Sequence, residues 1–353
     1  MPKGIFPIAS PDLSGNELEY VTQSLKEGWV SCRGPWVEEF EEKFAIRHGA
    51  RYGVSCTSGT TALMLALAAL NIGKGDEVIV PEFTMIATAW AVSYVGATPI
   101  FVDCDDNILI DVDKIEEKIT ARTKAIIPVH IYGRRVSIER IRKIADEYNL
   151  KIIVDAAEVH GMEACGDISC YSFFANKILT TGEGGMCVTD DKELAERLFY
   201  LKNMSFSPDH TFVHNEIGYN FRMTSLQAAL GLAQLERLGE FLAKRKQIEE
   251  WYNEGLRDIP QITIQPSRKL LWMYDILAEQ KEDLMEHLKE NGIETRHFFK
   301  PMSMQPMYLD GNYKKLKAYW FSQRGLYLPT YTQLTKEDVV FICEKIKEFY
   351  GQE

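Results

Sequence analysis

The sequence predicts an α/β fold in which a mostly parallel β-sheet is covered by helices on both faces. Through the first two thirds of the chain, short apolar runs typical of buried strands alternate with longer helix-like stretches. The chain has 353 residues, and 46% of them are hydrophobic. This is enough for a large core and favours two domains.

The predicted elements form a strand–helix series. The strand "GVSCTSG" (53–59) leads into the helix "TTALMLALAALN" (60–71). Further strands are expected at 76–81, 98–105, 123–133 and 150–158, and further helices at 85–96, 111–120 and 137–149. From about residue 225 the pattern becomes helical, and a smaller α+β segment follows.

We expect a large domain over 1–245, which includes an N-terminal arm, and a small C-terminal domain over 246–353. The Pro, Ser and Gln residues of "IPQITIQPSRK" (259–269) indicate a loop-rich entry to the small domain. In open α/β sheets, ligands bind outside the carboxyl ends of the strands. Functional residues are therefore expected where the strands of the large domain end.

Composition and charge argue against several classes of protein. The chain has 40 Lys and Arg against 51 Asp and Glu, a net charge of −11, without the basic cluster that nucleic-acid binding needs. The run "ALMLALAAL" is too short to span a bilayer, and no apolar signal segment is visible at the N-terminus. The seven Cys lack CxxC spacing, so we expect reduced thiols in a cytoplasmic protein and no metal site.

Small polar residues precede the helix that starts near residue 60. Ser58, Gly59 and Thr60 would place free N–H groups and partial positive charge at a helix N-terminus, which favours a phosphate. A plain helix cap is the alternative for these residues. Ser172, at the end of another apolar strand, would add a hydroxyl to the same phosphate site.

Two charged residues follow apolar strands. Asp155 ends "LKIIVD", where a buried carboxylate needs a cation or a donor, although a role as a turn cap is equally consistent with its position. Lys177 follows "DISCYSFFAN" and precedes a loop rich in Gly and Thr. A lysine in a partly desolvated pocket can form a Schiff base with a carbonyl; the alternative is a side chain that reaches solvent.

Taken together, these residues indicate a particular cofactor more specifically than any one of them does alone. A phosphate cup, a carboxylate and a downstream lysine are the groups that bind pyridoxal 5'-phosphate (PLP). Asp155 would keep the pyridine nitrogen protonated, and Lys177 would hold the aldehyde and move a proton.

Several motifs resemble the sugar aminotransferases of the DegT/DnrJ/EryC1/StrS family. They are "SGTTALMLALAAL", "GDEVIVPEFTMIATAWAV", "DAAEVHG", "SFFANKILTTGEGGMCVTDD" and "IGYNFRMTSLQAALGLAQLE", in the family's order. The resemblance covers nearly the whole chain. It implies PLP fold type I, with a seven-stranded sheet in the large domain, and a homodimer with active sites shared at the interface.

The resemblance also implies roles for single residues. Lys177 and Asp155 match the family's catalytic lysine and ring-nitrogen carboxylate, and Asn220 of "GYNFR" would reach the phosphate of the partner subunit. Glu158 matches a position close to the cofactor. Met85 stands where relatives usually stack an aromatic residue on the ring, and a Met can pack there through its sulfur.

On the substrate side, the resemblance indicates five contacts: Ser31, Arg33, His130, Tyr132 and Arg296. Packing at a strand end is the alternative for His130 and Tyr132, and an ordinary surface position is the alternative for Arg296. The chain departs from the family pattern at Ser303, where relatives often have His, and in a shortened segment over 161–166.

The implied reaction is a ping-pong transfer through a Lys177 aldimine. L-glutamate would donate the amino group, and a nucleotide-linked 4-keto-6-deoxyhexose would become the 4-amino-4,6-dideoxyhexose of the perosamine or viosamine type. Amination of a 3-keto sugar is the closer alternative. Lys177 argues against 3-dehydration, because such relatives carry His there, and a non-catalytic regulatory protein would have lost Lys177 or Asp155.

Overall fold

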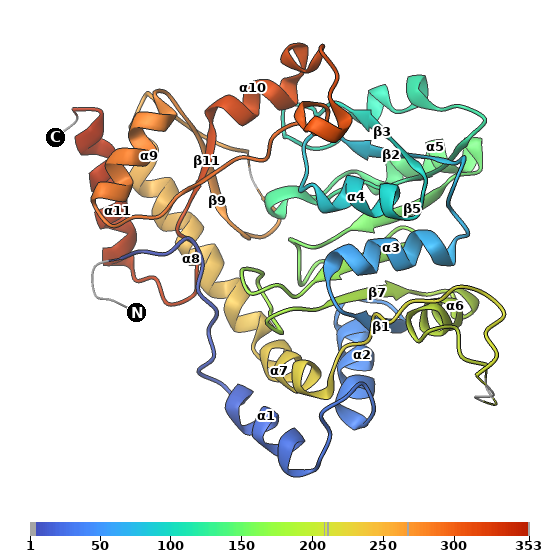
Figure 1. Ribbon diagram of the computed structural model, residues 1–353. Coiled ribbons are helices and arrows are strands. Elements are labelled where there is room, and N and C mark those ends of the chain that lie inside the picture. The colour runs from blue at the N-terminus through green and yellow to red at the C-terminus, as the bar shows by residue number, and fades with distance from the viewer. Residues whose placement is uncertain (1–4, 208, 210–211, 267, 352–353) are drawn as a thin grey trace.

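The computed structural model describes residues 5–207, 209, 212–266 and 268–351, and its two β-sheets lie side by side, with a long helix, α8, running from the large half to the small one (Figure 1). The helices are α1 (Glu17–Lys26), α2 (Pro35–Arg47), α3 (Gly59–Ala69), α4 (Ala87–Tyr94), α5 (Ile138–Tyr148), α6 (Lys192–Lys202), α7 (Ser225–Glu236), α8 (Leu238–Leu256), α9 (Lys281–Glu290), α10 (Lys317–Arg324) and α11 (Lys336–Phe349). The strands are β1 (Tyr52–Cys56), β2 (Glu77–Pro81), β3 (Thr98–Val102), β4 (Thr123–Ile126), β5 (Lys151–Asp155), β6 (Ile168–Ser172), β7 (Gly185–Thr189), β8 (Ile262–Ile264), β9 (Tyr274–Ala278), β10 (Arg296–His297) and β11 (Gly325–Leu328). Short 3-10 helices are η1 (Val112–Lys114), η2 (Glu116–Lys118), η3 (Ile131–Gly133), η4 (Met302–Met304), η5 (Pro306–Tyr308) and η6 (Tyr313–Lys315).

The large sheet has seven strands in the order β1-β7-β6-β5-β4-β2-β3. The strands from β6 to β3 pair in parallel, whereas β7 is antiparallel to both β6 and β1. The predicted α/β class with a mostly parallel, seven-stranded sheet is therefore confirmed. Because β1, β2, β4, β5 and β6 point the same way, their carboxyl ends meet at one edge of the sheet.

Both faces of this sheet are buried, as the apolar runs predicted. In β2, Ile79 packs into a core shared with α2, α5 and α7, while Val78 and Val80 pack into a core shared with α3, α4 and α6. β5 alternates in the same way, with Ile152 and Val154 on the first face and Ile153 on the second. A strand that is apolar on both faces fits only between two helical layers.

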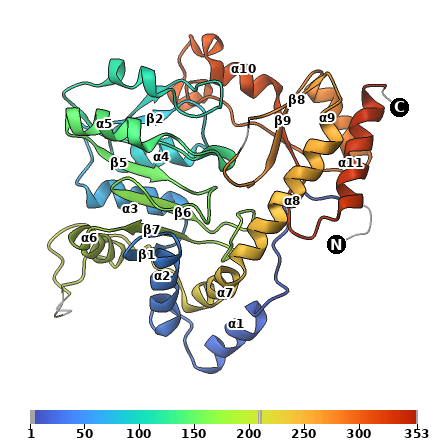
Figure 2. The ribbon, with the colours of Figure 1, turned by 180° about the vertical axis from the view of Figure 1, so that it is seen from behind.

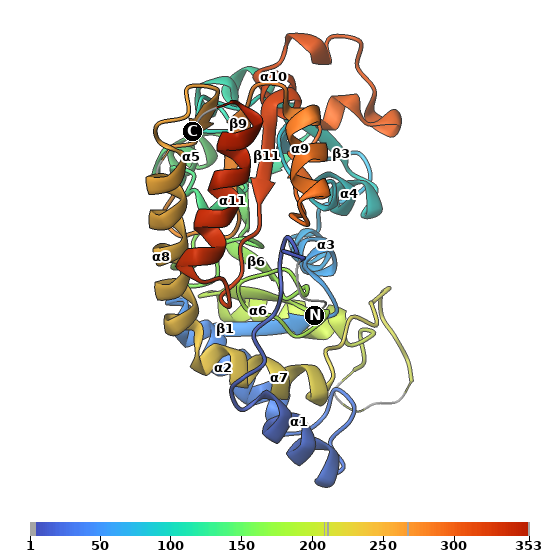
Figure 3. The same ribbon diagram turned by 90° about the vertical axis from the view of Figure 1, so that its left-hand side faces the viewer.

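The small sheet has the antiparallel order β10-β11-β9-β8, and its core is shared with α8, α9 and α11 (Figure 3). The N-terminal arm contributes here, because Phe6 bridges to Ile293. Further along the arm, α1 packs against α7, and the Tyr20 hydroxyl donates to Glu236 Oε1 at 2.7 Å (Figure 2). The arm therefore contacts both halves of the molecule.

The two halves meet along α8 and in a buried ionic cluster. The expected boundary between residues 245 and 246 falls inside α8, which is continuous from Leu238 to Leu256. Beside it, Asp275 of β9 is completely buried and binds two arginines. Arg134 Nη2 donates to Oδ2 at 2.9 Å, and Arg268 Nε donates to Oδ1 at 2.7 Å. Since Arg134 follows β4 of the large sheet, Asp275 ties that sheet to the small one.

One predicted element was wrong in type. The expected helix over 111–120 consists of two 3-10 turns, η1 and η2. Asp111 caps the first turn, and the two buried apolar residues, Val112 and Ile115, are three positions apart. This spacing suits the three-residue period of a 3-10 helix. The segment is also highly charged, and it has too few apolar residues to bury one face of a longer α-helix.

None of the helices that the structure describes combines the length and the apolar character needed to cross a membrane.

Replacing Asp275 with Ala should destabilise the protein strongly. The change leaves the guanidinium groups of Arg134 and Arg268 buried without their shared carboxylate, which costs about 3–5 kcal/mol. Urea unfolding should show this as a lower midpoint. The matched control is Asp258→Ala, which removes an exposed partner of Arg257 and should change the free energy of unfolding by less than about 1 kcal/mol. Equal effects of the two changes would contradict the role of Asp275.

Candidate active site

A cavity of about 350 Å³ opens at the carboxyl ends of the parallel strands. Its floor comes from the large domain: the start of α3, the segment after β2, the ends of β5 and β6, and Lys177. The opposite wall comes from the C-terminal half, through Trp272, Phe299 and Tyr327. The structure thus brings the predicted cofactor-binding residues, apart from Asn220, together where the parallel-sheet rule placed them.

The phosphate end of the cavity lies at the N-terminus of α3. Ser58 caps the helix by accepting the Thr61 N–H at 3.1 Å, so the helix begins with Gly59 and Thr60 at the cavity. A Cβ on Gly59 would lie only 2.7 Å from the Ser172 Cβ. The glycine therefore lets the strand end carrying Ser172 approach the helix start, which gathers N–H and hydroxyl donors around a space suited to an anion.

Asp155 lies deeper in the cavity and is buried. Its Oδ2 accepts the Thr88 hydroxyl at 2.8 Å, and its Oδ1 accepts the Ala157 N–H at 3.1 Å. Burial raises the pKa of this carboxyl, whereas the Thr88 and Ala157 donors and the charge of Lys177 lower it. A protonated ring nitrogen beside Asp155 would supply a cation that stabilises the carboxylate.

Lys177 places its ammonium between a carboxylate and an indole ring. Nζ lies 3.7 Å from Glu158 Oε1 and 4.2 Å from the centre of the Trp272 ring. Glu158 is oriented by the Tyr132 backbone N–H, which donates to Oε2 at 2.7 Å. Burial raises the pKa of Glu158 to about 7, against the lowering effect of Lys177. The carboxyl of Glu158 can therefore take up or release a proton near neutral pH beside the amine.

The residues present fit PLP. The cavity offers an anion cup at one end, a buried carboxylate for the ring nitrogen and a primary amine for the aldehyde. Met85 is 47% exposed and lines the cavity, in the position expected to face the ring. Asn176 also lines it, and its buried Oδ1 accepts no hydrogen bond from the described residues.

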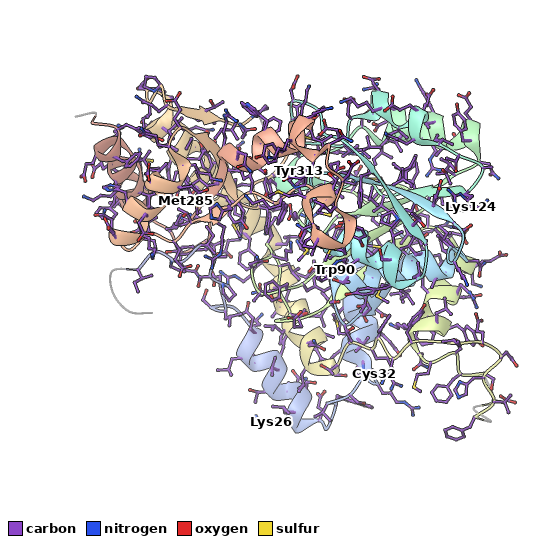
Figure 4. All side chains as sticks on the ribbon, turned by 45° about the horizontal axis from the view of Figure 1, so that its top comes forward. Lys26, Cys32, Trp90, Lys124, Met285 and Tyr313 are labelled. Atoms are coloured by element: carbon purple, nitrogen blue, oxygen red, sulfur yellow. The ribbon has the colours of Figure 1, made fainter. Side chains whose placement is uncertain are left out.

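The predicted substrate residues lie outside this cavity. Ser31 and Arg33 are exposed in the loop before α2, where Figure 4 labels Cys32 between them, and Arg33 lines a separate hollow beside Phe199 and Arg222. Arg296 is an exposed residue of β10. In the β10–β11 ladder Arg296 pairs with Tyr327, a cavity residue, so it stands next to the wall without lining it.

His130 and Tyr132 require a correction. Both are buried away from the cavity lining, so their positions fit the packing alternative instead of a substrate contact. The His130 ring accepts the Val136 N–H at 3.3 Å, and burial lowers the pKa of His130 to about 3. The Tyr132 ring packs behind Trp272 and Phe299. Its hydroxyl accepts the Phe299 N–H at 3.4 Å, and its backbone N–H donates to Glu158.

Asn220 does not line the cavity of its own chain. It is exposed, and its Oδ1 accepts from Arg222 Nε at 2.7 Å. This position leaves it available to a second subunit.

Sequence reasoning missed two residues that touch the predicted catalytic groups of Asp155 and Lys177. Thr88 occurs in an apolar helix, where a threonine carries no visible signal, yet it holds Asp155. Trp272 covers Lys177 from almost a hundred residues away in the chain. The indole N–H of Trp272 donates to the Asn176 carbonyl at 3.0 Å. The backbone carbonyl of Trp272 accepts a hydrogen bond from Arg245 Nη1 at 2.6 Å. Only the folded contacts identify it.

Comparison with known proteins agrees with this geometry. The sequence matches the DegT/DnrJ/EryC1/StrS aminotransferase family over residues 11–347. The chain belongs to this family. It is a PLP-dependent aminotransferase, and its catalytic lysine is predicted to be Lys177.

Two relatives and two solved structures illustrate the match. GDP-perosamine synthase of Escherichia coli O157:H7 is 42% identical, with 98% of each chain covered, and that of Caulobacter vibrioides is 41% identical, with 94% and 95% covered. The DesV structure from S. venezuelae, in complex with a ketimine intermediate, has a TM-score of 0.90 at 32% identity, with 96% and 95% covered. DesI with its TDP-sugar product has a TM-score of 0.90 at 29% identity, with 98% and 93% covered.

Thr88→Val should weaken PLP binding. The variant keeps the shape of the side chain but removes the hydroxyl donor of Asp155, and a hydrogen bond to a charged group contributes about 1.5–3 kcal/mol. The dissociation constant for PLP, followed by cofactor absorbance, should rise at least about tenfold. Thr88→Ser retains the donor and should bind almost normally. Equal affinities for the two variants would contradict the support of Asp155 by Thr88.

In the cofactor-free protein, Glu158 should contribute a loss of stability as the pH rises from about 4.5 to about 7, opposite in sign to the contribution of the buried His48, His130 and His160. In this range Glu158 keeps its proton in the folded state, with a pKa of about 7, and loses it in the unfolded chain, whose pKa is near 4.5. At this site the folded state binds more protons, so this contribution to the free energy of unfolding falls with rising pH. Glu158→Gln should remove the contribution, so across this range the urea midpoint of the variant should rise relative to that of the wild type. The exposed control Glu337→Gln should leave this part of the urea-midpoint profile unchanged; an unchanged slope in Glu158→Gln would contradict the assignment.

Proposed function

We propose that this aminotransferase converts a nucleotide-linked 4-keto-6-deoxyhexose to the corresponding 4-amino-4,6-dideoxyhexose, with L-glutamate as the amino donor. The observation that carries the proposal is the placement of Lys177 Nζ beside Glu158, 3.7 Å away, within the PLP-shaped cavity. The choice of substrate follows the relatives named GDP-perosamine synthase, which are 35–42% identical over nearly the whole chain.

Each protein group has a defined task in this reaction. PLP, when bound, supplies an electron sink that stabilises a carbanion next to the transferred nitrogen. The start of α3 and Ser172 hold the phosphate, and Asp155 keeps the ring nitrogen protonated. Lys177 Nζ removes the α-proton of the amino donor and later delivers a proton to C4 of the sugar.

Glu158 and Trp272 keep the amine of Lys177 in place. The carboxyl of Glu158 can take up or return a proton as Lys177 changes its protonation state, because its pKa is raised to about 7. Trp272 covers the amine from the opposite side and excludes water from it. The nucleotide of the substrate supplies binding energy away from the reacting carbon, which helps to orient the keto group.

We further propose a homodimer in which Asn220 reaches the phosphate site of the second subunit. The exposed position of Asn220, outside its own cavity, supports this arrangement. The side chains of Phe199, Phe212 and Ile217 are apolar and exposed, and such side chains are suited to an interface between subunits. A cytoplasmic location is consistent with seven cysteines that are all free thiols.

Mass spectrometry of a glutamate-dependent reaction tests the proposal. The panel contains GDP-4-keto-6-deoxymannose and the UDP- and dTDP-linked 4-keto-6-deoxyglucoses. We expect one member to gain an amine at C4, with the GDP sugar favoured by the relatives. If no member of the panel reacts but a nucleotide-linked 3-keto sugar, offered separately, gains an amine at C3, the alternative substrate replaces the proposed one. No turnover and no bound PLP would overturn the function itself.

Lys177→Ala should abolish turnover, with a loss of at least about a thousandfold, because no other amine lines the cavity in the described part of the chain. Lys124→Ala is the control, since this lysine is exposed on β4 (labelled in Figure 4). Single-turnover reduction of PLP absorbance by L-glutamate provides the measurement. Activity of Lys177→Ala at the wild-type rate would show that another residue moves the proton.

A further inference from the structure

The segment over 298–310 forms part of the cavity wall although it belongs to the C-terminal half of the chain. Phe299 lines the cavity, and Met302 and Ser303 are buried. The segment lies across the large domain beside α4: the Tyr308 hydroxyl is 2.6 Å from Ser93 Oγ. In Figure 4 the orange turns that carry Tyr313 lie in front of α4, where Trp90 is labelled.

Glu82, the first residue after β2, holds this segment by three hydrogen bonds. Its backbone carbonyl accepts the Met302 N–H at 2.9 Å. Its Oε2 accepts both the N–H and the hydroxyl of Ser303, each at 3.0 Å. These contacts connect residues that are more than 200 positions apart in the sequence, from opposite halves of the molecule.

A carboxylate is an expensive choice at this position. Glu82 is only 5% exposed, and among the described residues the charged side chains that act on it most are the carboxylates Asp103 and Asp310. Burial and the nearby Asp103 and Asp310 raise the pKa of Glu82, whereas the Ser303 donors lower it. Packing alone would be served by an apolar side chain at less cost. Unlike an apolar side chain, the carboxylate forms directional hydrogen bonds, and its acceptor oxygen therefore specifies one position for Ser303.

Cavity residues flank this contact on both sides. Thr84 and Met85 follow Glu82 by two and three residues, and Phe299 precedes Ser303 by four residues. Between them, the Phe83 ring contacts Phe298 and Phe299, with ring centres 5.6 and 6.1 Å apart. The Glu82–Ser303 contact therefore sets the separation between the wall that faces the cofactor ring and the outer wall at Phe299.

We propose that Glu82 and Ser303 are positioning residues for the sugar substrate: they hold Phe299 so that the cavity accepts the nucleotide-linked sugar. This rests on the proposed function. The amino donor is a small molecule that needs the Lys177 end of the cavity, where Trp272 and Glu158 are held by other contacts. The larger nucleotide sugar extends past the outer wall, so its binding depends on where Phe299 lies. The two half-reactions should respond differently to loss of the contact.

The test compares the half-reactions in Glu82→Ala and Ser303→Ala. We expect the KM for the nucleotide sugar to rise about tenfold, which corresponds to the loss of a hydrogen bond to a charged group. The first half-reaction with L-glutamate, followed by cofactor absorbance, should stay within about twofold of the wild type. Because the two residues share one contact, the double variant should show less than the product of the two single effects.

Conservative variants separate positioning from general stability. Glu82→Gln keeps an acceptor oxygen and Ser303→Thr keeps the hydroxyl, so both should retain a KM closer to that of the wild type. Ser93→Ala removes an exposed contact of the same segment and should leave both half-reactions unchanged. If Glu82→Ala slows the two half-reactions equally, or changes neither, the positioning role is overturned.

Amide hydrogen exchange gives a readout that needs no substrate. The Ser303 N–H should exchange at least about tenfold faster in Glu82→Ala than in the wild type, because its acceptor is lost. Unchanged exchange would overturn the proposal even if the enzyme acts on another sugar. Conversely, faster exchange together with failure of the wild type to aminate the panel would refute the proposed substrate and leave the contact itself intact.

Discussion

The buried carboxylate of Asp155 is the constraint on which the site depends. A carboxylate at the end of an apolar strand is stable only where donors or a cation compensate for lost hydration. Here Thr88 reaches it from α4 and the Ala157 N–H from the following turn. For Thr88 to do so, α4 must pack over the strand ends, which also brings Met85 and Thr84 to the cavity. The carboxylate of Asp155 thus helps to determine the arrangement of two neighbouring segments, the one between β2 and α4 and the turn after β5.

The fold and the cofactor end of the site could be predicted because their signals are local. Parallel strands buried on both faces are apolar on both faces through their centres, as in β2 and β5, and the residue that ends each strand falls at the same edge. Asp155 and Ser172 are such residues, and Ser58 lies two positions past β1. Knowing the fold class therefore places them together. Lys177 lies near the same edge of the sheet, one turn of chain after Ser172 ends β6.

The parts that could not be predicted depend on contacts between distant segments. Trp272 and Lys177 meet only because α8 and the small sheet pack onto the large one, and Asp275 gathers two arginines across the same junction. The error at His130 has the same origin. Its sequence position beside the site says nothing about whether its ring points to the cavity or, as the structure shows, toward Val136 and Cys165.

The site therefore has two parts. One is fixed by the strand ends of the large sheet, and the other is held by side-chain contacts between distant segments. The predicted phosphate cup, Asp155 and Lys177 lie at or just beyond the carboxyl ends of β1, β5 and β6, so their arrangement depends on the large sheet. The opposite wall is supplied by Trp272, Phe299 and Tyr327, from segments held by side-chain contacts such as Glu82 with Ser303. Those contacts can be exchanged without disturbing the sheet. Substitutions there are consequently the economical route by which this fold could accept a different sugar while keeping the same amine chemistry.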